Sequence, residues 1–307
     1  MANTYGKVSG TFEEIENAYG KVSGVWEEAD EIYAKNSGTW ELVFAAFTAT
    51  SLTTLSSGSG TFTVPDGANA LHIQASVGGG GGAMRGIDYD KAGGESAGAG
   101  GGSGAYISDK VFTVTTGETI SYSVGSSGAN GTGTYSGSAG GGASTTISGS
   151  TTGSIFTLTG GGGASASGGG VQGPLRSNTA GTAGSDTISG SVITSGNFRD
   201  TDLATKSVTT LTSGPTGTFN SNGNGAVGGN NGNCGGDNCQ IGGSTGAASY
   251  SGNVSGGAGS PVGTSTNGSA GTRGSGGGGG GAQYGPGSTQ GGSGGTGEVQ
   301  YRFLRVN

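Results

Sequence analysis

The side chains that could carry out acid–base chemistry are few and poorly placed for it. His72 is the one histidine in 307 residues, and it lies in a run with strand character. A structural or surface imidazole is therefore favoured over a member of a Ser-His-Asp triad. The doublets Glu13-Glu14 and Glu27-Glu28 belong to a repeat, which favours solvation or pairing with lysine over paired-carboxylate hydrolysis. We expect no enzymatic activity.

Cofactor and metal chemistry have equally little support. With 77 glycines, matches to the dinucleotide-binding pattern GxGxxG arise from composition, and none opens a helix after a strand. Cys234 and Cys239 are close enough in sequence to form a disulfide that closes a glycine loop, or to remain two free thiols. Two cysteines alone do not make a zinc site, and a calcium site at Asp237 is disfavoured. The sequence predicts no cofactor and no metal.

Charge and hydropathy argue against two classes of partner. A net charge of −7, a pI of about 4.6 and the lack of any run of lysine or arginine predict that the protein does not bind nucleic acid. No apolar run approaches the roughly 20 residues of a membrane span, and no signal peptide opens the chain. We therefore expect no membrane insertion. Synthesis in the cytoplasm and release by cell lysis, within a virus particle, fit these features.

A 14-residue repeat fills the N-terminal interval 1–47. Each copy aligns a tyrosine, a lysine, a Ser-Gly pair, an aromatic residue and a glutamate; the tyrosines and aromatic residues are Tyr5, Phe12, Tyr19, Trp26, Tyr33 and Trp40. Glycine permits the positive φ of a tight turn, so each copy is predicted to be a β-hairpin. Because a lone hairpin is marginally stable in water, these residues are predicted to form an attachment or oligomer interface. A short helix over 13–19 is the alternative.

Strand patterns dominate the middle and the end of the sequence. Runs of β-branched and aromatic residues, each ending at glycine, predict strands over 61–64, 70–77, 105–114, 119–124, 144–148 and 154–159. Val299, Tyr301 and Phe303 alternate with Gln300 and Arg302, which predicts a closing strand with one buried face. With 30% hydrophobic residues, one large core is excluded, so a small β-sandwich is expected. The fold class is predicted to be all-β, with almost no α-helix.

Glycine recurs at every third residue in patches of the sequence. Examples are Gly98-Gly101-Gly104, Gly125-Gly128-Gly131, Gly268-Gly271-Gly274 and Gly291-Gly294-Gly297. Collagen is excluded because the frame slips and the chain has five prolines. The spacing predicts polyproline-II-like helices that run antiparallel beside one another and hydrogen-bond to their neighbours, since this helix has no internal bonds. A flexible tail is the alternative, because such tracts bury little apolar surface.

The sequence resembles proteins of bacteriophage tails. The repeats YGKVSGTFEE, YGKVSGVWEE and YAKNSGTWEL look like the KVSGxW-type repeats at the ends of phage tail, fibre and baseplate-associated proteins. Similarity to the glycine-rich domain of phage tail fibres and minor tail proteins is carried by segments 60–82, 117–125, 159–163 and 294–299. The predicted glycine helices resemble the polyglycine-II region of T-even-type adhesins. The resemblance implies a homotrimeric tail fibre, tail tip or baseplate-attached adhesin, with tail proteins and a host glycan or outer-membrane protein as partners.

These patterns divide the chain into five parts. We expect hairpin repeats over 1–47, a linker over 48–60, a β-rich domain with glycine-rich excursions over 61–214, a polyglycine-II region over 215–297 and a closing strand over 298–307. The hairpins would attach the protein, and the glycine-rich part would project outward.

Charged and aromatic side chains inserted within glycine are the candidate contact residues. They are Arg85, Tyr89, Lys91, Phe198, Arg199 and Tyr284. Tyrosine and arginine offer large contact areas and directional hydrogen bonds, so these residues are predicted to contact either the host or other subunits. Two other functions remain as alternatives: a passive structural or decoration protein of the virion, and an ice-binding protein with a flat face of alanine, serine and threonine.

Overall fold

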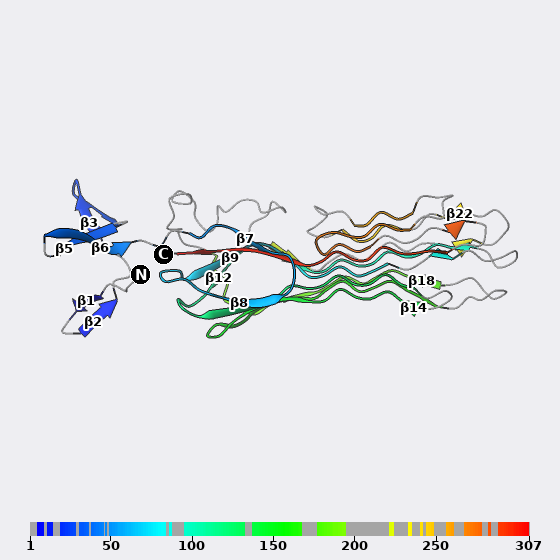
Figure 1. The fold of residues 1–307 in the computed structure, drawn as a ribbon, viewed down its shortest axis with the longest axis horizontal. Helices are drawn as coiled ribbons and strands as arrows, with labels where there is room; N and C mark the ends of the chain where they lie inside the picture. The colour runs from blue at the N-terminus through cyan, green and yellow to red at the C-terminus, as the bar shows by residue number, and fades with distance from the viewer. Residues whose placement is uncertain are drawn as a thin grey trace.

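The computed structural model shows an elongated, all-strand molecule (Figure 1). It describes residues 5–8, 11–14, 19–28, 31–36, 38–45, 47, 49–83, 86–87, 95–132, 137–167, 177–194, 221–223, 233–234, 240–241, 244–248, 256–260, 267–277, 282–283 and 288–306. Within these ranges there is no α-helix, and every strand pair is antiparallel. The predicted all-β fold is confirmed.

The N-terminal repeats form three separate hairpins. They pair β1 (Tyr5–Val8) with β2 (Thr11–Glu14), β3 (Tyr19–Val22) with β4 (Val25–Glu28), and β5 (Glu31–Asn36) with β6 (Thr39–Ala45). The turn glycines Gly24 and Gly38 have φ of 91° and 94°, which only glycine adopts readily. The alternative of a helix over 13–19 is wrong, because Glu13 belongs to β2 and Tyr19 begins β3.

Two five-stranded sheets form a sandwich next to the hairpins (Figure 1). The first sheet has the order β20 (Ser221–Gly223), β12 (Tyr106–Thr113), β9 (Ala70–Val77), β25 (Glu298–Leu304) and β7 (Thr53–Leu55). The second has the order β19 (Asp186–Ile188), β16 (Gly153–Leu158), β15 (Thr145–Gly149), β13 (Thr119–Ser123) and β8 (Ser59–Thr63). Each predicted strand is present, with ends that differ by no more than two residues, except that the closing strand predicted over 298–307 ends at Leu304.

The inner faces of the two sheets enclose the apolar core. Its largest fully buried side chains are Phe112, Phe156, Leu71, Ile73, Ile107, Ile120, Ile147, Ile155 and Leu158. Between the sheets, the rings of Phe62 and Tyr301 stack with centroids 4.3 Å apart. Val299, Tyr301 and Phe303 are buried while Gln300 and Arg302 are half-buried, which confirms the predicted closing strand. The alternation of side chains along each strand therefore produces the core.

Seven strands of the sandwich run on without a break into glycine-rich segments. The segments, with the strand that each continues, are 78–83 (β9), 98–105 (β12), 125–131 (β13), 139–143 (β15), 159–164 (β16), 180–185 (β19) and 290–297 (β25). With the further segments 244–247, 256–258, 267–272 and 274–277 they form an array that we call the glycine bundle. The bundle therefore contains segments from both the predicted β-rich domain, 61–214, and the predicted polyglycine-II region, 215–297.

Segment 78–83 lies at the centre of the bundle, and its peptide groups bond to six neighbours. Its N–H groups donate in turn, with a period of three residues, to carbonyls of 98–105, 139–143 and 290–297, at 2.8–2.9 Å. Its carbonyls accept from 159–164, 125–131 and 274–277, at 2.8–3.1 Å. The first three neighbours run antiparallel to it and the other three parallel. This pattern is the predicted stack of threefold helices joined by backbone hydrogen bonds, but the expectation that the helices all run antiparallel is wrong, because three of the six neighbours run parallel to the centre.

The six neighbours also bond to one another and close a ring around the centre. The joining bonds are Gly102 N to Gly162 O, Gly142 N to Gly161 O, Gly140 N to Ala129 O, Gly294 N to Gly128 O, Gly295 N to Ser275 O and Gly101 N to Gly277 O. Each member of this hexagonal array is therefore held from several sides. No single segment could form such a helix alone, because it makes no bond within itself.

Glycine is required in the array by close approach rather than by φ. A Cβ built on Gly80 would overlap the carbonyl oxygen of Ser275, and one on Gly81 would overlap that of Gly162. One glycine departs from its predicted role. Gly274 has a φ of 73° and lies in a turn where Ser275 N donates to Thr272 O, so the three-residue frame through Gly268 and Gly271 stops before it.

Short strands form small sheets where the bundle ends away from the sandwich (Figure 1). We call them the distal sheets. They are β21 (Asn233–Cys234), β11 (Glu95–Ser96), β10 (Gly86–Ile87) and β24 (Ser288–Thr289) in that order; β14 (Gly137–Ser138), β17 (Ser165–Ser167) and β18 (Ser177–Thr179); and β22 (Gln240–Ile241) with β23 (Ala282–Gln283).

Candidate functional site

Four of the six predicted contact residues fall in connections that leave the distal end of the bundle. Arg85 stands between segment 78–83 and β10, Tyr89 and Lys91 between β10 and β11, and Tyr284 between β23 and β24. These four residues lie outside the described residues. Apart from segment 78–83, the elements that flank them belong to the distal sheets, and β11, β10 and β24 are neighbours in one sheet. The topology thus brings the two connections on either side of β10 to the same sheet as the connection between β23 and β24, which is remote in sequence.

The other two contact residues, Phe198 and Arg199, do not share this location. They also lie outside the described residues, in a connection whose described ends are both in the sandwich. On one side Val192 bridges to Phe112, and on the other β20 pairs with β12. The sequence prediction grouped all six residues together, because the sequence alone does not show whether a connection lies at the sandwich end or at the distal end of the molecule.

Uncharged amide side chains fasten neighbouring segments near the distal end. Asn130 Nδ2 donates to Gln290 Oε1 at 3.2 Å, and Gln290 N donates to Asn267 Oδ1 at 2.8 Å. Asn178 Nδ2 donates to the carbonyl of Ala97 at 2.8 Å. Sequence reasoning missed these residues, because isolated amides in a polar tract carry no pattern. They join neighbouring segments at the places from which the distal connections leave the bundle.

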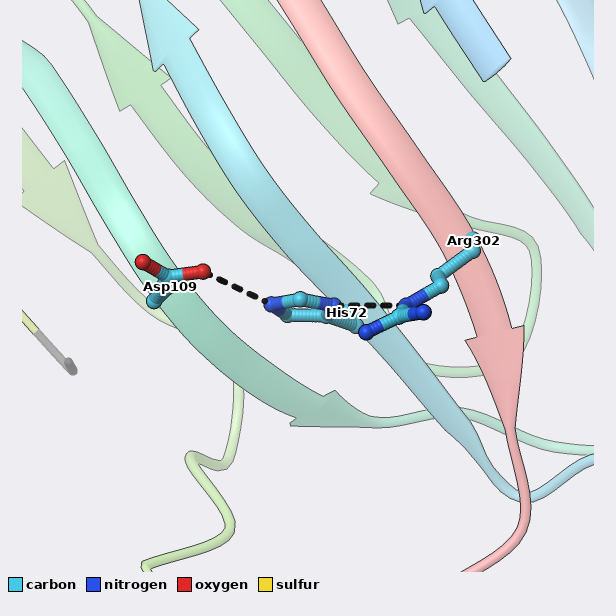
Figure 2. Close-up of polar contacts among 3 residues, drawn as sticks. All are labelled: His72, Asp109 and Arg302. Atoms are coloured by element: carbon cyan, nitrogen blue, oxygen red, sulfur yellow. Dashed lines mark hydrogen bonds and ion pairs between the residues drawn. The ribbon is translucent and has the colours of Figure 1, made fainter. Parts of the chain in front are cut away.

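His72 sits in a buried polar network on the outer side of the first sheet (Figure 2). Arg302 Nε donates to His72 Nδ1 at 3.1 Å, so that nitrogen carries no proton, and Nε2–H then donates to Asp109 Oδ1 at 3.2 Å. Burial lowers the pKa of His72, and the charge of Arg302 lowers it further, against the opposing hydrogen bond of Asp109. Both ring nitrogens are engaged, which supports the structural interpretation over a triad base.

Glu118 is a buried charged residue that the sequence analysis did not single out. Its carboxylate accepts from Thr115 N at 2.8 Å, Thr151 N at 3.1 Å, Thr152 N at 3.0 Å and Thr152 Oγ1 at 2.6 Å. Burial acts to raise its pKa, but these hydrogen bonds outweigh burial, and the pKa is lowered overall. The carboxylate therefore fastens the β15–β16 turn to the start of β13.

The candidate attachment residues of the hairpins share one register. Lys7 pairs with Phe12, Lys21 with Trp26 and Lys35 with Trp40, while Tyr5, Tyr19 and Tyr33 each pair with a residue two places beyond the aromatic. The structure thus gives the three tyrosines one equivalent backbone position and the three other aromatic residues a second one.

The predictions on the cysteines, metal binding and membrane insertion concern residues that the structure describes only in part. Cys234 lies in β21 opposite Glu95, whereas Cys239 is outside the described residues, so the disulfide stays a prediction. Among the described residues, no group of three or more histidine, cysteine, aspartate or glutamate side chains could hold a metal ion. No membrane-spanning helix occurs in the part of the chain that the structure describes.

A family model matches most of the chain. The model of a family described as a glycine-rich domain matches residues 53–304, an interval that begins at β7 and ends with β25. It therefore takes in the sandwich, the glycine bundle and the distal sheets, and leaves out the three hairpins. No curated protein matches the sequence.

Proposed function

This chain belongs to the family of glycine-rich domains, and on that premise we propose that it is a non-enzymatic structural protein of a bacteriophage tail that contributes to attachment to the host cell. The hairpin repeats would bind it to other tail proteins. The glycine bundle would hold the distal connections away from the particle, towards a glycan or protein of the host surface.

One observation carries this proposal: the bundle separates two ends of different character. The hairpins and the sandwich are at one end, and the connections with Arg85, Tyr89, Lys91 and Tyr284 leave from the other. Because the bundle is joined through peptide groups, side chains in the connections can change without disturbing it. A rigid support with variable ends suits a binding protein, and several copies on one particle would add weak contacts into strong attachment.

The phage assignment comes from the sequence. The KVSGxW-type repeats resemble those of phage tail proteins, and their three hairpins lie outside the matched domain. A hairpin is too small to be stable alone, so an attachment role gives each the partner it needs.

Competition with infection tests the proposal. Purified full-length protein added to host cells should bind them and reduce infection by the phage. The variant Arg85→Ala/Tyr89→Ala/Lys91→Ala should lose both effects, whereas Phe198→Ala/Arg199→Ala, altered between elements of the sandwich, should keep both. Absence of the chain from phage particles would overturn the tail assignment. Failure of the wild-type protein to bind cells would favour a passive structural role.

A second candidate function has one observation in its favour. Ser126, Ser127 and Ala129 are exposed on segment 125–131, where they give the bundle a flank of small side chains. An ice-binding protein would use such a face. Thermal hysteresis in a solution of the pure protein would support that function, and ordinary freezing behaviour would exclude it.

A further inference from the structure

One edge of the sandwich lacks the features that normally protect the edge of a sheet. The two sheets have four edge strands, and β8 is the longest, with five residues against three each in β7, β19 and β20. Edge strands are usually kept from pairing with another chain by short length, charge, proline or a bulge. β8 pairs with β13 in one unbroken register and contains neither a charged residue nor proline. Its free edge is therefore open to a further strand.

The free edge of β8 presents the peptide groups of alternate residues. Val64, directly after β8, donates its N–H to the carbonyl of Glu118 at 2.9 Å, on the side of β13. The direction of the peptide groups reverses at each residue of a strand. The N–H and carbonyl groups that point away from β13 are therefore those of Ser59, Thr61 and Thr63, and all three residues are exposed.

The sequence around this edge carries no charge. The formal net charge of the chain is −7, yet no charged residue occurs between Glu41 and Asp66. The opposite edge of the same sheet, β19, contains Asp186. Because like-charged molecules repel one another, an uncharged edge is the place where a second copy of this chain meets the least repulsion.

β8 is complementary to itself in one antiparallel register. When Thr61 of one copy lies opposite Thr61 of the other, Ser59 lies opposite Thr63. Every N–H and carbonyl of these residues then has a partner, and the opposed hydroxyl side chains form favourable cross-strand pairs. On the other face of the strand, Phe62 lies opposite Gly60, so a large ring is placed beside a residue without a side chain.

The ring of Phe62 already belongs to a row of aromatic rings at this edge. It stacks on Tyr301 with centroids 4.3 Å apart and on Tyr122 with centroids 6.0 Å apart. The ring of Tyr122 extends over Gly60, where a Cβ would come within 2.9 Å of its hydroxyl oxygen. Phe62 and Tyr122 are half-buried, so the Phe62 ring of a second copy, opposite Gly60, would extend the row and cover the exposed part of both rings.

From these observations we infer that the free protein forms a twofold dimer in which the β8 strands of two copies pair antiparallel, with Thr61 at the axis. Such a contact uses the same surface on both copies and is complete with two. The joined sheet has the two β8 strands at its middle and the short, charged β19 strands at its edges. The homotrimer expected from the sequence does not arise from this contact and is the competing arrangement.

The pairing also fixes the relative orientation of the two copies. β13, the neighbour of β8, continues into segment 125–131 of the glycine bundle. Antiparallel β8 strands therefore direct the two bundles in opposite directions, and both copies cannot project outward from one particle. On the premise of the proposed function, the dimer is the form that precedes attachment to a tail, and it covers an edge that would otherwise favour aggregation.

Cysteine cross-linking of the purified full-length protein tests the register. Opposed residues of a hydrogen-bonded pair have Cα atoms about 5.5 Å apart, a distance that a disulfide spans. Under oxidation, Thr61→Cys should give a covalent dimer on a non-reducing gel, and so should the double variant Ser59→Cys/Thr63→Cys. Thr63→Cys alone should not, because it lies opposite a serine, and the wild type controls for Cys234 and Cys239. No dimer with Thr61→Cys, or equal amounts with Thr63→Cys, would overturn the inference.

Sedimentation equilibrium tests the dimer without oxidation. The wild type should associate to a dimer, and Thr61→Lys, which places two like charges opposite each other, should weaken association about fivefold. Thr187→Lys is the matched control, because Thr187 is exposed on β19 at the other edge of the same sheet, and it should dimerise as the wild type does. Both variants should keep the thermal unfolding of the wild type. A wild-type monomer or trimer, or equal weakening by the two lysines, would contradict the β8 contact.

These measurements are independent of the proposed function. They use the purified chain and no phage particles or host cells. If no dimer forms, this inference fails while the tail assignment stands, because that assignment is decided by the presence of the chain in particles and by its binding to host cells.

Discussion

Seven strands of the sandwich continue into the glycine bundle, but the two regions are held together by different groups. In the sandwich, side chains such as Phe112 and Phe156 fill the space between two sheets. In the bundle, neighbouring backbones leave no room for a Cβ on Gly80 or Gly81, and peptide groups make the contacts. A glycine-rich segment with little apolar surface can therefore continue an ordered strand, provided that an apolar core fixes where the strand begins.

The two regions also differ in how their stability depends on neighbours. Burial of apolar surface contributes about 25 cal/mol per Å², whether or not the whole sheet is complete. A peptide hydrogen bond contributes only about 0.5–1.5 kcal/mol net, and ordering glycine costs more entropy than ordering other residues. A single glycine segment therefore gains too little to order itself. The closed ring around 78–83 gives each segment bonds on several sides, which offsets this cost.

The largest effect is expected from adding one methyl group inside the bundle. A Cβ on Gly142 would overlap the carbonyl of Gly79, which is backbone and cannot rotate away. Gly142→Ala should lower the free energy of unfolding by about 3 kcal/mol, at the upper end of overpacking costs. Calorimetric melting and hydrogen exchange of the 78–83 amides would measure the loss.

The adjacent residue provides the matched control for this prediction. A Cβ on Gly141 would meet Gly161 O at 3.5 Å, an ordinary contact. Gly141→Ala should be neutral, or stabilising by up to about 1 kcal/mol through the unfolded chain. Equal effects at the two positions would show that side-chain-free packing does not hold the bundle.

A smaller effect is expected where the sandwich uses a buried charge. Glu118→Gln keeps the shape of the side chain but removes half of its acceptor capacity, so donors from Thr115, Thr151 and Thr152 lose partners. The loss should be about 2 kcal/mol in urea unfolding at neutral pH, since hydrogen bonds to charged groups contribute about 1.5–3 kcal/mol. The exposed Asp66→Asn should be neutral.

Glu118 also predicts behaviour in acid. Its pKa is lowered in the folded state, so its contribution is present above the unfolded pKa of about 4.3 and is lost as the pH falls through the folded pKa. The difference in stability between wild type and Glu118→Gln should therefore shrink in strong acid. A difference that stays constant down to pH 2 would show that the carboxylate charge is not responsible.

The smallest effect concerns His72. Its pKa is lowered by burial, so the unfolded chain takes up the proton first, and stability present above the unfolded pKa of about 6.5 decreases as the pH falls. Because the chain has one histidine, the change in urea midpoint between pH 7.5 and pH 5 should report this group. His72→Gln should flatten the change. A decrease that persists in this variant would assign the pH dependence to other groups.

The sequence predicted the sandwich strands well because side-chain alternation is local. The closing strand could be identified from Val299, Tyr301 and Phe303 alone. The three-residue frame also held where it was interrupted by other residues, as at Gly128 and Gly131, whose N–H groups both donate to 78–83. The three-residue spacing can be recognised in the sequence because other residues separate the glycines there.

The central segment and the distal sheets could not be predicted in the same way. A run of consecutive glycines such as 78–82 has no frame to detect, so its six neighbours become evident only in three dimensions. Gly274 fits the frame by number but lies in a turn, because φ is not encoded by the identity of a glycine. Strands of two residues such as β10 and β24 exist only through their partners, which are remote in sequence.

The position of β25 has a consequence for how the domain is made. This strand lies between β9 and β7, and segment 290–297 before it is one of the six around the centre. The last part of the domain to leave the ribosome is thus a missing interior piece, and until it arrives both the sheet and the ring have a gap. Translation products that end before β25 cannot close either one, so the domain can complete its fold only after this strand has been made.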